Sequence, residues 1–143
     1  MRGEPATEVS PTLRLPVREQ RRCSRVQGEA PAEPTHAHGL RVLMTADTLG
    51  GVWSYALELA HALAVRGAEV ALATLGREPD TEQEEAAQRV PRLRLYRSGF
   101  RCEWMDDPWE DVERSGRWLR DIAAEFRPHV VHLNSFSHAA EPF

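Results

Sequence analysis

From residue 40 onward, short apolar runs typical of strands alternate with segments in which apolar residues recur at helical spacing. Residues 40–46 are an almost unbroken apolar run, typical of a central parallel strand that is covered on both faces. Residues 51–66 repeat at helical spacing, and Gly67 follows as the end of that helix. Residues 69–75 read as a second buried strand, so the pattern predicts a right-handed strand–helix–strand unit. The helix face expected to pack on the sheet holds Val52, Tyr55, Ala56, Leu59, Ala60 and Leu63.

The polar stretch after Gly76 predicts a short helix and then a strand. The Thr81-x-x-Glu84 spacing fits a capping box, and the helix is expected to reach about Arg89 before Pro91 stops it. Residues 93–97 alternate apolar and polar side chains, which predicts a strand nearer the edge of the sheet.

Residues 107–133 predict a further helix and a fourth buried strand. Asp107 is the expected cap, Pro108 the first helical residue, and Gly116 is expected to permit close approach of a neighbour. Residues 129–133 read as the strand. The alternation of strands and helices predicts an α/β fold with a Rossmann-like parallel sheet and flanking helices. The expected sheet-facing residues of this helix are Trp109, Val112, Leu119, Ile122, Ala123 and Phe126.

Two polar loops are expected to meet at the carboxyl edge of this sheet. In an open parallel sheet, ligands bind beyond the carboxyl ends of the strands, where the strand order reverses. If the first strand is central and the fourth lies on its other side, residues 47–51 and 134–138 flank that point. Asp47 and Asn134 stand at the two strand ends and are therefore candidates to line the crevice.

The Gly50-Gly51 pair between the first strand and its helix is the best candidate for a phosphate site. A helix start presents unpaired backbone N–H groups and a favourable dipole to an anion. The pattern lacks the further glycines of a dinucleotide fingerprint and the Lys-Ser/Thr of a P-loop, and Gly76-Arg77 replaces the acid that would bind a ribose. A glycine turn that only lets strand and helix pack closely is the alternative.

Composition narrows the function classes. The chain has 143 residues and a formal net charge of −4, which argues against a nucleic-acid partner. No apolar run is long enough for a membrane span or signal peptide, so the expected location is the cytoplasm. Residues 1–38 carry five prolines among polar residues and are expected to be a disordered extension. Cys23 and Cys102 lack metal-ligand spacing, and the His36/His38 pair lacks a third ligand, so no metal is expected.

Several other polar residues admit two interpretations. Asp106 and Asp107 resemble a carboxylate pair, but acids before a proline more often cap a helix. His132 lies within an apolar strand, which favours a buried, hydrogen-bonded histidine over a base. For His138, beyond the strand end, a ligand role and a structural role stay open.

Three blocks of the sequence resemble a known family. Arg41–Ala60, Glu103–Trp109 and His129–Asn134 together resemble the N-terminal domain of family 4 glycosyltransferases of the GT-B fold, over about residues 39–143. The block Glu103–Trp109 looks like a bacterial subgroup of those enzymes.

The resemblance implies retaining, metal-independent transfer of a sugar from a nucleotide-sugar donor to a sugar or polyol acceptor, without a cofactor. It places Gly50 and Gly51 against the donor diphosphate, and His138 in the position of a histidine that faces the reacting sugar. Trp53 is expected beside Asp47 and Asn134 as a cleft-lining residue.

The same resemblance implies a partner domain. The family's C-terminal, donor-binding domain is absent from these 143 residues, so the chain is expected to be a fragment without turnover of its own. Peripheral membrane contact stays open. A non-catalytic nucleotide- or phosphate-binding module is the second hypothesis, and an NADP-type oxidoreductase half-domain is disfavoured by the glycine pattern.

Overall fold

The computed structural model describes residues 38–143, so most of the predicted N-terminal extension, together with Cys23 and His36, lies outside the described residues. Within the described part, strands and helices alternate strictly, as β1 (Arg41–Asp47), α1 (Gly51–Val65), β2 (Glu69–Leu75), α2 (Thr81–Gln88), β3 (Leu93–Tyr96), α3 (Trp109–Phe126) and β4 (Val130–His132). All strand pairs are parallel and the order is β3-β2-β1-β4. The predicted α/β, Rossmann-like sheet is confirmed.

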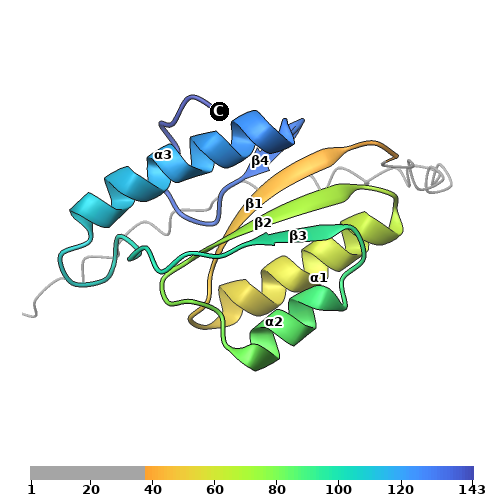
Figure 1. Ribbon diagram of the computed structural model, residues 1–143, viewed down its shortest axis with the longest axis horizontal. Coiled ribbons are helices and arrows are strands. Elements are labelled where there is room, and N and C mark those ends of the chain that lie inside the picture. The colour runs from red at the N-terminus through yellow and green to blue at the C-terminus, as the bar shows by residue number, and fades with distance from the viewer. Residues whose placement is uncertain (1–37) are drawn as a thin grey trace, which may run out of the picture. The chain divides into compact units, whose positions relative to one another are not determined.

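The sheet is covered on both faces, as Figure 1 shows: α1 and α2 lie on one side and α3 on the other. Successive residues of β1 face opposite sides, since Leu43 packs with Leu119 and Ile122 of α3 while Met44 packs with Trp53 and Ala56 of α1. The five central residues of β1 are all buried. This double coverage explains why the sequence of the strand is apolar throughout.

The buried face of α1 matches the predicted one except at Tyr55: Ala56 and Ala60 are buried, and Val52, Leu59 and Leu63 pack partly buried against the core. Its buried residues are Trp53, Ala56, Ala60 and Ala64, whereas Tyr55 is 48% exposed. The three alanines recur every four residues, so they form one stripe along the helix. Their small side chains let α1 lie close to the strands, and the bulkier leucines pack at the flanks of the contact.

The caps of both remaining helices lie one residue away from the predicted caps. For α2 the cap is Asp80, whose side chain accepts from the Gln83 N–H, so the capping box is Asp80/Gln83 and not Thr81/Glu84. For α3 the cap position is Pro108, with no side-chain cap, and the helix starts at Trp109. Trp109 is 70% exposed, so its predicted place in the core is wrong.

Two further predictions concern Gly116 of α3 and the burial of β4. A Cβ on Gly116 would collide with Oε1 of Glu141, which confirms that this glycine permits close approach. β4 is short and pairs only with β1 in the described sheet, and its Val130 is 47% exposed, so the prediction of a fully buried strand is wrong. None of the helices in residues 38–143 is long and apolar enough to cross a bilayer.

Candidate functional site

The predicted meeting of two loops is present. β1 lies between β2 and β4, so the strand order reverses at β1, and the loops that follow β1 and β4 leave neighbouring strand ends. Asn134 joins the two strands directly: its backbone N–H donates to Oγ1 of Thr45 at 3.0 Å and its Nδ2 donates to the Thr45 carbonyl at 2.7 Å. The Asn134 side chain therefore holds the end of β4 against β1.

The first loop is a tight turn between β1 and α1. Oδ1 of Asp47 accepts a hydrogen bond from the Leu49 N–H at 2.9 Å, which is the geometry of an Asx turn. Gly50 follows with φ 95° and ψ −154°, a conformation that is essentially restricted to glycine. The backbone conformation thus accounts for Gly50, and the carboxylate of Asp47 acts within the turn.

Gly51, the first residue of α1, has no such explanation. Its φ is not in the left-handed region, and a Cβ built on it would meet nothing within 4 Å. Gly50 has no side chain to cap α1, and the first turn of α1 contains no acidic residue. By contrast, α2 has the Asp80 cap and acids at Glu82 and Glu84. The start of α1 therefore presents uncapped N–H groups and a positive dipole end beside bare space.

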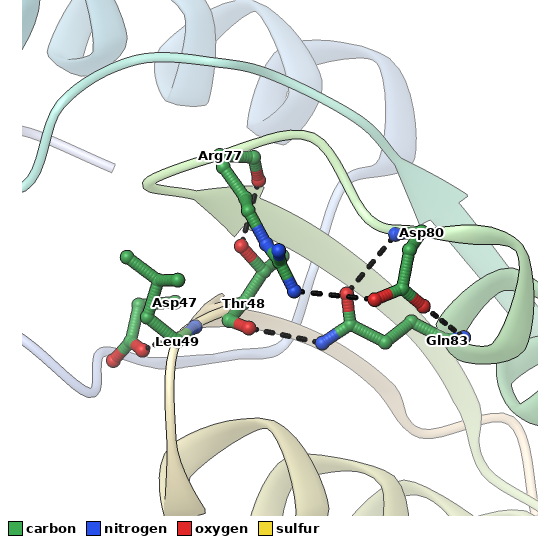
Figure 2. Close-up of polar contacts among 6 residues, drawn as sticks. All are labelled: Asp47, Thr48, Leu49, Arg77, Asp80 and Gln83. Carbon is green, nitrogen blue, oxygen red and sulfur yellow. Dashed lines mark hydrogen bonds and ion pairs between the residues drawn. The ribbon is translucent and has the colours of Figure 1, made fainter.

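Thr48 anchors the turn to the loop after β2. It is 2% exposed. Its N–H donates to the Leu75 carbonyl at 3.1 Å and its Oγ1 donates to the Arg77 carbonyl at 2.7 Å. Figure 2 shows Thr48 and Arg77 together with Gln83, whose Nε2 donates to the Thr48 carbonyl at 2.9 Å. Neither Thr48 nor Gln83 was predicted as part of the site, although Asp80-x-x-Gln83 meets the capping-box pattern as well as the predicted pair does.

His138 lies inside the protein, 2% exposed, against α3. Oγ of Ser115 donates to the Val112 carbonyl at 3.0 Å, so it accepts from Nε2 of His138 at 2.9 Å. Nδ1 of His138 contacts Oγ of Ser137 at 3.2 Å. Burial lowers the pKa of His138 below its ordinary value of 6.5, with smaller opposing effects from Val112, Glu141 and Glu103. Both ring nitrogens are used internally, so the geometry favours the structural interpretation of this histidine.

A carboxylate extends this network to the loop between β3 and α3. Oε2 of Glu103 accepts from Oγ of Ser135 and Oγ of Ser137, both at 3.3 Å. Phe136, between the two serines, is 94% exposed. The loop after β4 is thus attached to α3 through His138 and to residues 98–108 through Glu103.

The other predicted site residues lie elsewhere. Trp53 of α1 is 6% exposed and packs in the core between α1 and the sheet. It borders a groove between α1 and α2, so it does not line the crevice as predicted. His132 contacts Oδ1 of Asn134 through Nε2 at 3.2 Å, in agreement with a hydrogen-bonded histidine. The carbonyls of Asp106 and Asp107 accept from Arg101, and neither side chain caps α3.

The described residues offer little for metal or thiol chemistry. No group of three or more His, Cys, Asp or Glu side chains in residues 38–143 is arranged to hold a metal ion. Cys102 is a buried free thiol, and burial raises its pKa to about 11, with Asp47 and Glu103 adding to the shift. A thiol with such a pKa is a weak nucleophile at neutral pH.

Comparison with known families gives one match. A family model described as "Glycosyl transferase 4-like domain" matches residues 50–141, which include the glycine pair, the loop after β4 and all elements from α1 to β4. No curated protein and no solved structure shows a significant match.

Proposed function

Because the chain belongs to the glycosyl transferase 4-like domain family, we propose that it is the acceptor-side domain of a retaining glycosyltransferase. In this proposal the enzyme transfers a sugar from a nucleotide-sugar donor to a sugar or polyol acceptor, and it needs no metal or further cofactor. The N–H groups at Gly50 and Gly51 receive the donor diphosphate. In this proposal a second, donor-binding domain supplies donor selection and most of the charge that stabilises the leaving group.

One observation supports the phosphate assignment above the others. Glycine at position 51 is required neither by the backbone conformation nor by packing, since any residue adopts its φ and a Cβ would meet nothing. Glycine at an ordinary helix position costs free energy relative to alanine. A ligand that must approach the backbone N–H closely gives this position a reason to lack a side chain.

The remaining residues hold the site in shape. Asp47 fixes the turn through the Leu49 N–H, and Asn134 fixes the end of β4 through Thr45. We assign His138 the same kind of task in the loop after β4, because both of its ring nitrogens bind neighbouring side chains. The acceptor would then lie over the two loops, with the donor diphosphate at the start of α1.

The proposal is tested by NMR with the full 143-residue chain. A ¹⁵N-labelled sample is titrated with UDP-glucose, GDP-mannose and ADP-glucose, and with sodium sulfate as an anion control. We expect at least one nucleotide-sugar to shift the amide resonances of Gly50, Gly51 and Val52 at concentrations where sulfate does not. Absence of such shifts up to millimolar ligand would refute the assignment of the diphosphate to this turn.

A phosphate-binding module without transfer is the second candidate, and the internal hydrogen bonds of His138 are the observation that favours it. It uses the same turn, so binding alone does not separate the two. The DNA that follows the codon for Phe143 does: an open reading frame that encodes a donor-binding domain supports transfer. If only the 143-residue chain is expressed, and it binds a nucleotide-sugar without releasing nucleoside diphosphate, the phosphate-binding module is supported.

A further inference from the structure

Hydrogen bonds from Thr48 hold the glycine turn against the β2–α2 region. A Cβ at Gly50 or Gly51 would meet no atom within 4 Å, so no side chain presses on the turn at either position. Two residues earlier, Thr48 is buried, and its N–H, hydroxyl and carbonyl all make hydrogen bonds to the β2–α2 region. The direction in which the turn leaves β1 therefore depends on what holds Thr48.

Gln83 performs two tasks with one side chain. Its Oε1 accepts from the Asp80 N–H at 3.1 Å, which completes the cap of α2, and its Nε2 donates to the Thr48 carbonyl at 2.9 Å. Figure 2 shows the amide between these two partners. Only this orientation of the amide satisfies both, because the oxygen must face an N–H and the nitrogen must face a carbonyl.

We propose that Gln83 is a positioning residue for the phosphate turn, which it sets by holding the Thr48 carbonyl, so that the hydrogen bond from α2 determines how tightly Gly50 and Gly51 bind a diphosphate. The inference rests on the proposed function, since it assumes that the turn binds phosphate. It assigns a role in that site to α2, a helix that contributes no side chain to the crevice. The Asp80 cap and the Thr48 contact are joined through Gln83, so the start of α2 and the start of α1 are held as a unit.

The two tasks of Gln83 are separable by Gln83→Glu. A glutamate carboxylate accepts from the Asp80 N–H, and glutamate at this position of a helix is a favoured capping-box residue. An ionised carboxylate has no proton to donate, and it faces the Thr48 carbonyl oxygen with a negative charge. The variant therefore keeps the cap of α2 and loses the hold on the turn.

A charge control is available at the neighbouring position. Glu82 is exposed in the same first turn of α2. Glu82→Gln combined with Gln83→Glu leaves the composition and net charge of this turn as in the wild type. Glu82→Gln alone keeps Gln83 and serves as the matched single variant.

The experiment measures binding of inorganic pyrophosphate by the full chain, followed through the amide resonances of Gly50, Gly51 and Val52 at pH 7.5. We expect Glu82→Gln to bind at least as well as the wild type. The double variant should bind about fivefold or more weakly, because the turn loses its fixed geometry while the number of charges stays the same. In ligand-free spectra the resonances of Leu49, Gly50 and Gly51 should move in the double variant, whereas in Glu82→Gln alone they should stay at their wild-type positions.

Three results are decisive. Weaker binding by the double variant, together with displaced ligand-free resonances of Leu49, Gly50 and Gly51, supports the inference. Equal binding by the wild type and the double variant would overturn the role of Gln83 and leave the phosphate turn standing. If the wild type itself binds no pyrophosphate, the proposed function fails at this site, and the inference fails with it.

Discussion

Replacing Gly51 with alanine should raise the stability of the protein and weaken its binding of phosphate. The residue is the first of α1, is exposed, and has room for a Cβ on every side. A side chain at this place tilts toward the start of the helix, which is where an anion would lie. Stability and binding are therefore expected to change in opposite directions.

The magnitudes follow from the geometry at Gly51. A glycine replaced by alanine in a compatible conformation stabilises a protein by roughly 0.4–1 kcal/mol. For a domain of this size that corresponds to a rise in Tm of roughly 2–6 °C. Loss of one hydrogen bond from the backbone to a charged phosphate oxygen costs about 1.5–3 kcal/mol, or about tenfold to a hundredfold in Kd.

The assay pairs urea denaturation with NMR titration of pyrophosphate, on the wild type, Gly51→Ala, Gly50→Ala and Ser54→Ala. Gly50→Ala should lower the free energy of unfolding by about 1–3 kcal/mol, because φ 95° with ψ −154° strains any other residue. Ser54 is exposed one turn further along α1, so Ser54→Ala should change stability slightly and leave binding as it is. A Gly51→Ala protein that binds pyrophosphate as tightly as the wild type would refute the idea that position 51 lacks a side chain so that a ligand can approach the backbone.

Two further predictions concern buried groups. Burial lowers the pKa of His138, so below about pH 6.5 this histidine binds a proton more readily in the unfolded chain than in the folded protein. Its contribution to the free energy of unfolding should be fully present above that pH and should fall as the pH drops toward the folded pKa. The urea midpoint measured from pH 7.5 to 5 should therefore fall more steeply in the wild type than in His138→Gln, and parallel curves would contradict this account. The Cys102 thiol, with its pKa raised from 9.0 to about 11, should react with iodoacetamide at pH 8 roughly 100-fold more slowly in the folded protein than in urea, when the labelled peptide is quantified by mass spectrometry. Similar rates in both states would show that the thiol is not buried in solution.

The topology of this domain could be predicted because individual features of the sequence determine where a strand lies in the sheet. The unbroken apolar run before Asp47 requires cover on both faces, which places β1 inside the sheet. The alternating pattern at residues 93–97 places β3 at an edge. Once β1 is interior, the reversal of strand order and the meeting of the two loops follow from the handedness of the connections.

The errors concern choices that only the packed structure decides. On α1, Tyr55 has the right spacing for the core, but it is exposed, and Trp53 is buried instead. On α3, Trp109 has the right spacing for the core, but the buried part of the helix begins only at Ser115. The hydrogen bond from Gln83 to Thr48 spans 35 residues, and neither residue type signals the other. The depth of His138 likewise depends on Ser115, which stands 23 residues earlier.

The unequal lengths of strand pairing around β1 bear on how the site fluctuates. β1 pairs with β2 over seven residues but with β4 over three. In native-state hydrogen exchange, short edge pairings open at lower free energy than long central ones. The turn at Gly50 is thus built on the most persistent pairing of the sheet, and the loop at Asn134 on the weakest. A ligand that bridges the two would protect the amides of β4 far more than those of β1, and part of its binding energy would be spent in ordering that strand.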